Sequence, residues 1–326
     1  MNRDTPYSEL SPETVLDAIE ALHYRCDGRV LALNSYENRV YQIGIEGGEP
    51  LVAKFYRPNR WSDAAIREEH AFAAELAAQE IPVVAPLTQD GEALHVHRGF
   101  RYAVFPRRGG RWPELGSRDD REWVGRFLGR IHAVGRAAYF RERSALSVED
   151  LGRHARDFVL KGDWMPDYLA TKYADVTDEL LEAVESRALG WGGAAVGRIL
   201  GDCHRGNILW TEQGPHFVDL DDCVTGPAIQ DLWMLTAGGL QETRTELTDL
   251  LKGYEQFMPF DRREIALIEP LRALRMIHYS AWLARRWHDP AFPKAFPWFA
   301  EPRYWEQHYR ALQDQLAAVL APPLEL

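Results

Sequence analysis

Apolar positions repeat with two different periods along the chain, and the change from one period to the other divides it. Near the start, apolar residues recur every three or four positions after Ser11 and Pro12, which predicts a helix with Ser11 as its N-cap. The next apolar segments are short and partly alternating, which is typical of strands. Strands are predicted over 30–33, 40–45 and 51–55, followed by a helix over 62–79 and strands over 93–97 and 100–105.

The chain changes character after residue 107, at a polar segment that contains Gly109 and Gly110. Beyond this segment, the period of a helix covers most of the sequence. Helices are predicted from 119, between 144 and 188 with breaks, from 227, and over 243–257, 262–287 and 304–320, with a proline- and aromatic-rich loop over 289–302. We therefore predict an α+β protein with two lobes, residues 1–107 and residues 108–326.

One predicted hairpin interrupts the helical part and carries several polar side chains. Apolar runs over 208–210 and 216–218 flank a glycine-containing turn at 212–215. Asp202 and Asn207 precede the first arm and Asp219 follows the second, so the hairpin should hold all three at one end of two paired strands. Carboxylate and amide oxygens suit Mg²⁺. This spacing is also the catalytic arrangement of phosphoryl transfer in kinases.

The same segment resembles a known superfamily. The sequence L-G-D-C-H-R-G-N-I-L at 200–209, followed by V-D at 218–219, resembles the catalytic and metal loops of the aminoglycoside phosphotransferase and choline-kinase-like superfamily. Segments 33–41, 54–58 and 218–222 are similar to a bacterial group of serine/threonine protein kinases within it. The resemblance spans nearly the whole chain. It implies a bilobal protein-kinase-like fold, with a small antiparallel-sheet lobe carrying a helix and a larger, mainly helical lobe.

The resemblance also implies a function and a set of roles. The function is ATP- and Mg²⁺-dependent phosphoryl transfer to serine or threonine hydroxyls of proteins, in a stress response. Asp202 and Asp219 would be catalytic, with Asp202 accepting the proton of the acceptor hydroxyl. Asn207 and Asp219 would hold the metal ion. Lys54 follows Val-Ala in a predicted strand, as the nucleotide-binding lysine of kinases does, and would pair with phosphates and with a helix carboxylate. In the family, Asp231 bonds the catalytic-loop backbone.

The resemblance also implies three further residues of the nucleotide site. In the family, the carboxylate that pairs with the lysine lies thirteen residues before the first proline of the P-V-x-x-P segment, here Pro82, which selects Glu69, with Glu68 as the other possibility. Phe105 ends the last strand of the small lobe, where the hinge would bind adenine. Ser35 lies in the loop between the first two strands, which would face the phosphates.

Two positions depart from the family pattern, and two more residues have open roles. Leu200 stands where the family usually has a histidine that supports the loop. Loop 35–38 has no glycine, so Asn38 and its neighbours would offer amide, hydroxyl and backbone N–H groups; a plain hairpin turn is the alternative. Cys203 is either a redox-sensitive residue beside the base or, as we favour, a packing residue. Asp221 would contact a second metal ion or cap the following turn.

Composition narrows the classes of function. The net charge is −11 without any block of five like charges, so strong nucleic-acid binding is not expected. Three cysteines without a C-x-x-C motif fit a reducing cytoplasm. Residues 1–5 lack the apolar core of a signal peptide, and no run of 18 apolar residues predicts a membrane span. We expect a cytoplasmic monomer whose partners are ATP and a protein substrate with a serine or threonine acceptor.

Three alternatives stay open. A small-molecule kinase of the aminoglycoside, choline or homoserine type shares every motif and differs only in its acceptor groove. Leu200 favours a catalytically weak nucleotide-binding regulator. The presence of the residues that catalysis would need argues against it: Lys54, Asp202, Asn207 and Asp219. A haloacid-dehalogenase-type phosphatase is suggested by F-V-D-L-D at 217–221. That fold requires strand–helix repeats after the motif, whereas predicted helices follow here.

Overall fold

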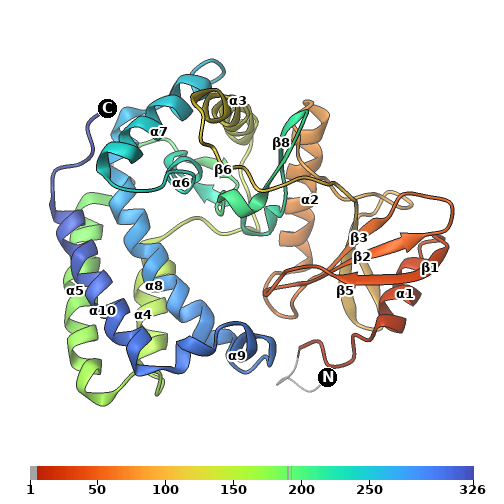
Figure 1. The fold of residues 1–326 in the computed structure, drawn as a ribbon, viewed down its shortest axis with the longest axis horizontal. Helices are drawn as coiled ribbons and strands as arrows, with labels where there is room; N and C mark the ends of the chain where they lie inside the picture. The colour runs from red at the N-terminus through yellow and green to blue at the C-terminus, as the bar shows by residue number, and fades with distance from the viewer. Residues whose placement is uncertain (1–5, 189–190, 192) are drawn as a thin grey trace.

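The computed structural model describes residues 6–188, 191 and 193–326 of the chain. The expected absence of a signal peptide concerns residues 1–5, which lie outside the described residues. Figure 1 shows a lobe built on a β-sheet beside a larger helical lobe, so the α+β bilobal prediction is confirmed. Among the described residues, no helix is both long and apolar enough to cross a membrane.

The smaller lobe is a five-stranded antiparallel sheet with the strand order β1-β2-β3-β5-β4. Its strands are β1 (Cys26–Ala32), β2 (Arg39–Ile45), β3 (Leu51–Phe55), β4 (His95–His97) and β5 (Phe100–Pro106). The apolar face of the sheet, which includes Ala53 and Phe55, packs against α1 (Pro12–Glu20). Lys54 has the opposite parity, because side chains alternate along a strand. It therefore points to the other face, where Ala103 is its neighbour in β5.

Helix α2 (Asp63–Ala78) covers that second face and joins the two lobes. Its N-terminus is fixed by Ser62, whose hydroxyl accepts the N–H of Ala65 at 3.0 Å. Ile66 packs in the small cluster under the sheet. Phe72 and Leu76 lie further along the helix, towards its C-terminus, and belong to the core of the helical lobe. The helix that carries Glu68 and Glu69 is thus anchored on both sides of the interlobe junction.

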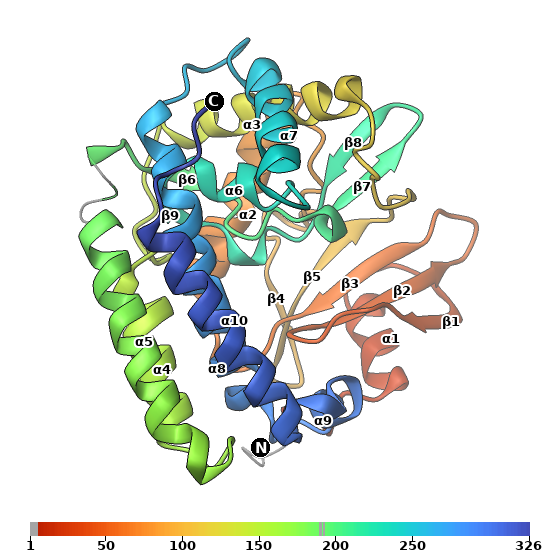
Figure 2. The ribbon, with the colours of Figure 1, turned by 60° about the vertical axis from the view of Figure 1, so that its left-hand side comes forward.

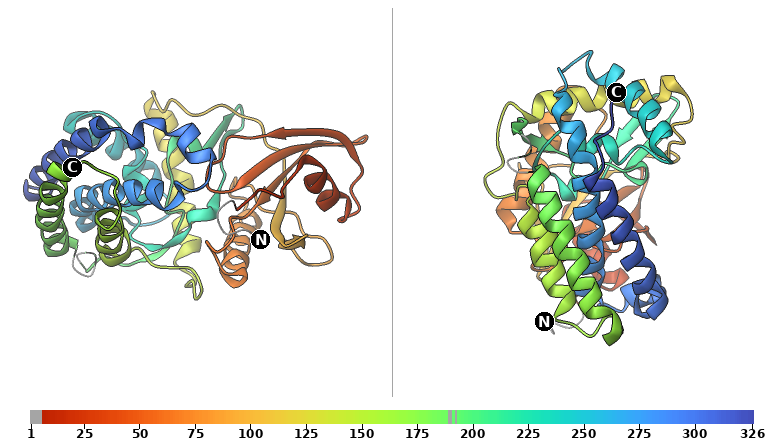
Figure 3. Two further views of the ribbon diagram at one scale, coloured as in Figure 1. Left: turned by 90° about the horizontal axis from the view of Figure 1, so that it is seen from below. Right: turned by 90° about the vertical axis from the view of Figure 1, so that its left-hand side faces the viewer.

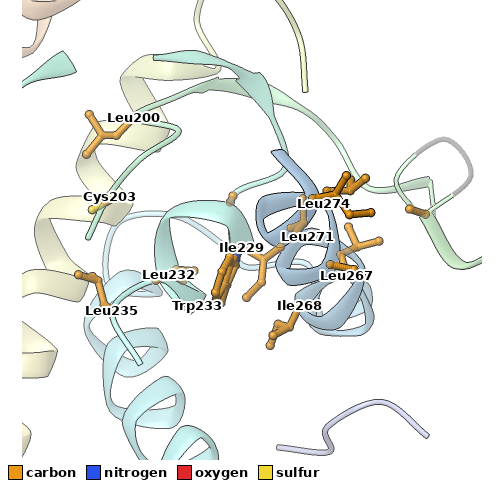
Figure 4. Close-up of a cluster of buried hydrophobic side chains, with 14 of the residues drawn as sticks. Leu200, Cys203, Ile229, Leu232, Trp233, Leu235, Leu267, Ile268, Leu271 and Leu274 are labelled. Carbon is orange, nitrogen blue, oxygen red and sulfur yellow. The ribbon is translucent and has the colours of Figure 1, made fainter. Parts of the chain in front are cut away.

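The helical lobe contains a bundle and a separate helix pair. Figures 2 and 3 show the bundle helices side by side: α4 (His154–Leu160), α5 (Asp167–Ala188), α8 (Ile268–Arg286) and α10 (Pro302–Leu320). The pair consists of α3 (Arg118–Gly135) and α7 (Leu240–Tyr254). The short helix α6 (Ile229–Trp233) lies between this helix pair and the bundle. Its apolar side chains pack on Leu267, which directly precedes α8, and on Ile268 and Leu271 in the first turn of α8 (Figure 4).

The predicted hairpin is present with a tighter turn than expected. Strands β7 (Ile208–Thr211) and β8 (Gly214–Phe217) pair with Ile208 opposite Phe217, so the second strand begins at Gly214 and ends before Val218. A second pair of strands, β6 (Gly197–Ile199) and β9 (Val224–Gly226), encloses the hairpin in the sequence. The described elements after β9 are all helical, which argues against the phosphatase alternative.

The start of one predicted helix and one predicted loop need correction. The helix predicted from residue 227 begins at Ile229. The loop predicted over 289–302 contains α9 (Ala291–Ala295) and a 3₁₀ turn (Pro297–Ala300). Proline is compatible with the first turn of a helix, and the side chains of Phe292 and Phe299 are fully buried. Burial of these aromatic side chains therefore stabilises helical turns in a segment whose local sequence favours a helix only weakly.

A glycine contact between α3 and α7 gives a direct test of this packing. A Cβ atom on Gly125 would lie 2.0 Å from the carbonyl oxygen of Leu250, so Gly125→Ala should force the helices apart. We expect a loss of about 3 kcal/mol in unfolding free energy, measured by urea denaturation. Gly116→Ala is the control, because its Cβ would meet open space. Equal stability of the two variants would contradict the observed helix contact.

Candidate active site

Lys54 lies at the centre of three carboxylates at the junction of the lobes. Its Nζ atom is 2.9 Å from Oδ1 of Asp219, 3.2 Å from Oδ1 of Asp221 and 3.4 Å from Oε1 of Glu69. Burial alone would lower the pKa of Lys54, but the three carboxylates outweigh it and raise the pKa well above its usual value. The amine is therefore a charged ammonium group that ties β3 to α2 and to the segment after β8.

The two adjacent glutamates of α2 have different partners. Glu69 contacts Lys54, whereas the carboxylate of Glu68 accepts the backbone N–H groups of residues 141–143 at 2.8–3.0 Å. Burial first raises the pKa of Glu68, but these three hydrogen bonds outweigh it and lower the pKa. Glu68 thus fixes the loop that carries Arg143. The guanidinium of Arg143 is buried and donates to the carbonyl oxygens of Cys223 and Ala65.

The backbone of the catalytic loop is held by a buried aspartate, as the sequence resemblance implied. The carboxylate of Asp231 accepts the N–H groups of Leu200 at 2.7 Å and of Gly201 at 2.8 Å. Its Oδ2 atom also lies 2.9 Å from Nε2 of His132, a contact that the sequence analysis missed. The side chain of Leu200 packs in the helical core beside Cys203 (Figure 4). Loop support therefore comes from Asp231 and His132.

Asp202 faces two basic side chains. Its Oδ1 atom accepts a hydrogen bond from Nη1 of Arg275 at 2.7 Å, and its Oδ2 atom is 3.5 Å from Nε2 of His204. Burial would raise the pKa of Asp202, but His204 and Arg275 outweigh it and hold the pKa well below its usual range. The carboxylate is therefore ionised at neutral pH. Arg275 lies on α8, 73 residues along the chain, and no local motif marks it.

Asn207 and Asp219 keep oxygen atoms available for a metal ion. The Nδ2 atom of Asn207 donates to the carbonyl oxygen of Asp202 at 3.0 Å, which leaves its amide oxygen free of that contact. The side chain of Asp219 is half exposed and uses Oδ1 for Lys54. Its backbone is left-handed, with φ of +57°, which is uncommon for a residue other than glycine. An amide oxygen and a carboxylate oxygen are the hard donors that Mg²⁺ prefers.

These two donors are too few for a metal cage made by the protein alone. Within the part of the chain that the structure describes, no three histidine, cysteine, aspartate or glutamate side chains form a metal-binding group. Mg²⁺ is commonly held by one or two protein side chains together with phosphate oxygens and water. The residues present therefore fit a metal ion that arrives with a nucleotide.

The structure corrects the expected roles of Asn38 and Asp221. The side chain of Asn38 is buried: its Nδ2 atom donates to Oδ2 of Asp221 at 3.0 Å, and its Oδ1 atom accepts the N–H of Arg57 at 3.1 Å. Asp221 is buried as well and pairs with Arg60 and Lys54. Burial would raise its pKa, but Arg60 and Lys54 outweigh this effect and lower the pKa. Both side chains therefore fasten the loop between β1 and β2 to the site.

Ser35 and Phe105 occupy the expected positions in the chain. Ser35 is half-buried in the loop between β1 and β2, and Phe105 is half-buried near the end of β5, opposite Val52. Beyond β5, the backbone of Arg111 exchanges two hydrogen bonds with Trp210 in β7, at 3.1 and 2.7 Å. The linker between the lobes is thus fixed to the hairpin. The nucleotide-binding roles of Ser35 and Phe105 stay predictions.

Cys203 is a packing residue in this structure. Its side chain is buried beside Asp202, and burial raises the pKa of the thiol well above its usual value. A thiol that stays protonated and inaccessible is a poor nucleophile, so the redox role loses its basis.

The loop between β1 and β2 is also tied to the end of α8. Glu37 lies 2.9 Å from both Arg57 and Arg286 and accepts the indole N–H of Trp282 at 2.7 Å. Arg57 in turn pairs with buried Asp289 at 2.8 Å. We call these five side chains the Glu37 clamp. Because Glu37 and Arg57 belong to the sheet lobe and the others follow or end α8, the clamp fixes the lobes relative to each other.

The fold and this site define a class of protein. A lysine–glutamate pair in a small antiparallel lobe faces an aspartate–asparagine loop and a second aspartate of a helical lobe, which is the arrangement of a bilobal kinase-type phosphotransferase. Residues 29–268 match the phosphotransferase enzyme family (APH), and the chain belongs to that family.

Full-length relatives are similar in sequence. Stress response kinase A of Salmonella choleraesuis strain SC-B67 is 46% identical over 321 residues, which cover 98% of this chain and 97% of the relative. The serine/threonine protein kinase RdoA of Salmonella typhimurium strain LT2 is also 46% identical over 321 residues, with the same two coverages. The resemblance noted in the sequence is therefore confirmed.

A solved structure shows the same fold at lower identity. Amicoumacin kinase hAmiN, in complex with AMP-PNP, Ca²⁺ and Ami, superposes with a TM-score of 0.75 and 20% identity. The superposition covers 99% of this chain and 97% of that chain. At this identity, the likeness concerns the fold.

The contribution of the Glu37 clamp to the stability of the folded protein should depend on pH, because the clamp contains Asp289. Burial would raise the pKa of Asp289, but the hydrogen bond from Arg57 and the N–H of Ala291 outweigh it and lower the pKa. Because the pKa of Asp289 is lowered in the folded state, its carboxylate stabilises the folded state at pH values above its unfolded-state pKa of about 4. This stabilisation is lost as the pH falls through the folded-state pKa. Asp289→Asn should therefore cost about 3 kcal/mol at pH 7, and the difference from the wild type should narrow below about pH 4.

Thermal unfolding of the wild type and of Asp289→Asn between pH 3.5 and 7 measures how their stability difference depends on pH. The control is Asp178→Asn, since Asp178 pairs with Arg156 at the surface with a half-exposed carboxylate. We expect this control to change stability by less than about 1 kcal/mol at every pH. If Asp289→Asn lowered the unfolding free energy by as little as the control does, the Glu37 clamp would not stabilise the protein.

Proposed function

We propose that this protein is an ATP- and Mg²⁺-dependent kinase that phosphorylates serine or threonine hydroxyls of proteins, in a stress response. One observation carries the proposal of an active kinase. Lys54 contacts both Glu69 and Asp219, which are 15 and 165 residues away in the sequence. These contacts support the proposal, because the nucleotide-binding lysine, its helix partner and the metal-binding aspartate of a kinase would have to lie together. The protein acceptor and the stress response are supported by the names of the relatives at 46% identity.

Each residue then has a role in the reaction. Lys54, oriented by Glu69, would hold the nucleotide phosphates. Asn207 and Asp219 would hold Mg²⁺, which when bound neutralises charge on the phosphate oxygens. Asp202 is ionised, so it would orient the acceptor hydroxyl and accept its proton. A bond forms between the acceptor oxygen and the γ-phosphorus, the bond from that phosphorus to the β–γ bridging oxygen breaks, and ADP leaves.

Further parts of the proposal follow from position in the chain. Ser35 would face the phosphates, and the backbone near Phe105 would bind adenine. The two lobes would divide after residue 107, next to the end of β5 at Pro106. A cytoplasmic monomer remains our expectation.

A small-molecule kinase is the second candidate, because one specific observation favours it. The structure of amicoumacin kinase hAmiN shares this fold over nearly the whole chain. The two candidates share every catalytic residue and differ in the acceptor. A nucleotide-binding regulator without activity is less well supported, because Asp202 is charged and held in place by Arg275 and the loop backbone.

Replacing the proposed base tests the reaction. Asp202→Asn should lower phosphoryl transfer from radiolabelled ATP by about 10²- to 10⁴-fold. Nucleotide binding should survive, because the Lys54 cluster is unchanged. Transfer is measured with protein acceptors and a panel of small alcohols side by side, and ATP binding by calorimetry. Equal labelling by the wild type and the variant would overturn the proposed chemistry, and labelling of alcohols alone would favour the small-molecule alternative.

The adjacent glutamates of α2 provide a matched pair. Glu69→Gln removes a charged partner of Lys54, so kcat/KM for ATP should fall by about 10- to 100-fold. Glu68→Gln weakens the hold on residues 141–143 and should lower the unfolding temperature while kcat/KM changes by less than about threefold. Steady-state kinetics and thermal unfolding of both variants separate the two roles. The reverse pattern would show that the lysine partner has been assigned to the wrong residue.

A further inference from the structure

One face of α8 extends from the proposed base to the loop between β1 and β2. Arg275, Tyr279, Trp282 and Arg286 follow each other at intervals of four, three and four residues, so they lie on the same side of the helix. Arg275 contacts Asp202 at one end, and Trp282 and Arg286 contact Glu37 at the other. This face is therefore continuous with the catalytic loop and with the loop expected to cover the phosphates.

Aromatic side chains line the same region and are partly exposed. The ring of Tyr279 stacks near that of Trp282 at 5.7 Å, and Trp282 lies 5.8 Å from Phe296 at the end of α9. Phe296 is 4.8 Å from Tyr36 in the loop between β1 and β2. Tyr36 and Tyr279 are 44% and 39% exposed, respectively. We call Tyr36, Arg275, Tyr279 and Phe296 the acceptor face; α9 lies between the helical bundle and the sheet in Figure 1.

Arg275 is the exposed cation of this face. Its side chain is 43% exposed, although Nη1 is bonded to Asp202. A guanidinium group has five N–H donors, so one contact leaves donors for a second anion. Burial is the main cause that lowers the pKa of nearby His278 to about 4, and Arg285, Arg275, Arg60 and Arg286 add to this effect.

An acceptor must approach this arginine closely. A hydroxyl that gives its proton to Asp202 has to lie about 3 Å from that carboxylate, and Arg275 is 2.7 Å from the same carboxylate. A group next to the hydroxyl is therefore within reach of the guanidinium. A carboxylate there would gain a charge-assisted, potentially bidentate contact, whereas an ammonium group would be repelled.

We propose that the acceptor face binds a polypeptide and that Arg275 selects a serine or threonine with an aspartate or glutamate close beside it. This inference rests on the proposed kinase function, because it names the acceptor of that reaction. Arg275 contacts the base through Nη1 and the acidic side chain of the acceptor through its other donors. Tyr36, Tyr279 and Phe296 supply apolar area for the neighbouring side chains of the peptide.

The test compares three peptides that differ only beside the serine, with aspartate, asparagine or lysine there. With Mg²⁺ and ATP, the wild type should phosphorylate the aspartate peptide with a kcat/KM about tenfold or more above that of the asparagine peptide. The lysine peptide should be poorer still. Arg275→Gln should bring the aspartate-to-asparagine ratio close to one, and Arg275→Lys should restore part of it, since a point charge lacks the planar fork of arginine.

Arg272→Gln is the matched control. Arg272 lies on the same helix, pairs with Glu269 at 3.4 Å and packs over Trp233. Its replacement should leave the aspartate-to-asparagine ratio unchanged. Equal kcat/KM values of the wild type for the aspartate and asparagine peptides would overturn the inference and leave the kinase proposal standing. Absence of transfer to any peptide would overturn the inference together with the proposed protein acceptor.

Discussion

The contact that the rest of the site depends on is the ion pairing of Lys54 inside the protein. An isolated buried ammonium group would lose its proton or remain in water. Here three carboxylates stabilise its charge: Glu69 from α2, and Asp219 and Asp221 from the segment after β8. Removing one partner from such a buried cluster leaves an uncompensated charge, which is costly. The position of β3 relative to α2 and to the segment after β8 is thus set by charge neutralisation as well as by apolar packing.

The carboxylates around Lys54 need cations of their own, and arginines supply them from several elements. Asp221 pairs with Arg60, and Arg143 lies 3.8 Å from Oε2 of Glu69. Arg143 reaches this position because Glu68 binds the backbone before it. Arg57 extends the network to Glu37 and Asp289, and so to the end of α8. The active site, the interlobe junction and the start of the C-terminal helices are therefore one electrostatic unit, so that a charge change in one part affects the others.

Much of this arrangement could be predicted from the sequence, because short-range patterns determine it. The hairpin and its flanking aspartates, the strand that carries Lys54, and the helix that carries Glu69 all follow from local periodicity and spacing. Arg275 could not be predicted in the same way, since it meets Asp202 across 73 residues without a motif at its own position. Asn38 was misjudged for a related reason. Its amide suits a phosphate as well as a buried carboxylate, and the sequence does not reveal that Asp221 lies opposite it.

Leu200 shows how a departure from a family pattern can leave the loop backbone supported. A histidine at this position would support the catalytic loop through packing and a backbone bond. The leucine side chain supplies packing in the helical core, and the loop N–H groups are bound by Asp231, itself in contact with His132 of α3. A buried carboxylate that accepts two backbone N–H groups fixes their position more strictly than an apolar contact does, because hydrogen bonds are directional. The placement of Asp202, two residues further on, therefore depends on Asp231 more than on the residue at position 200.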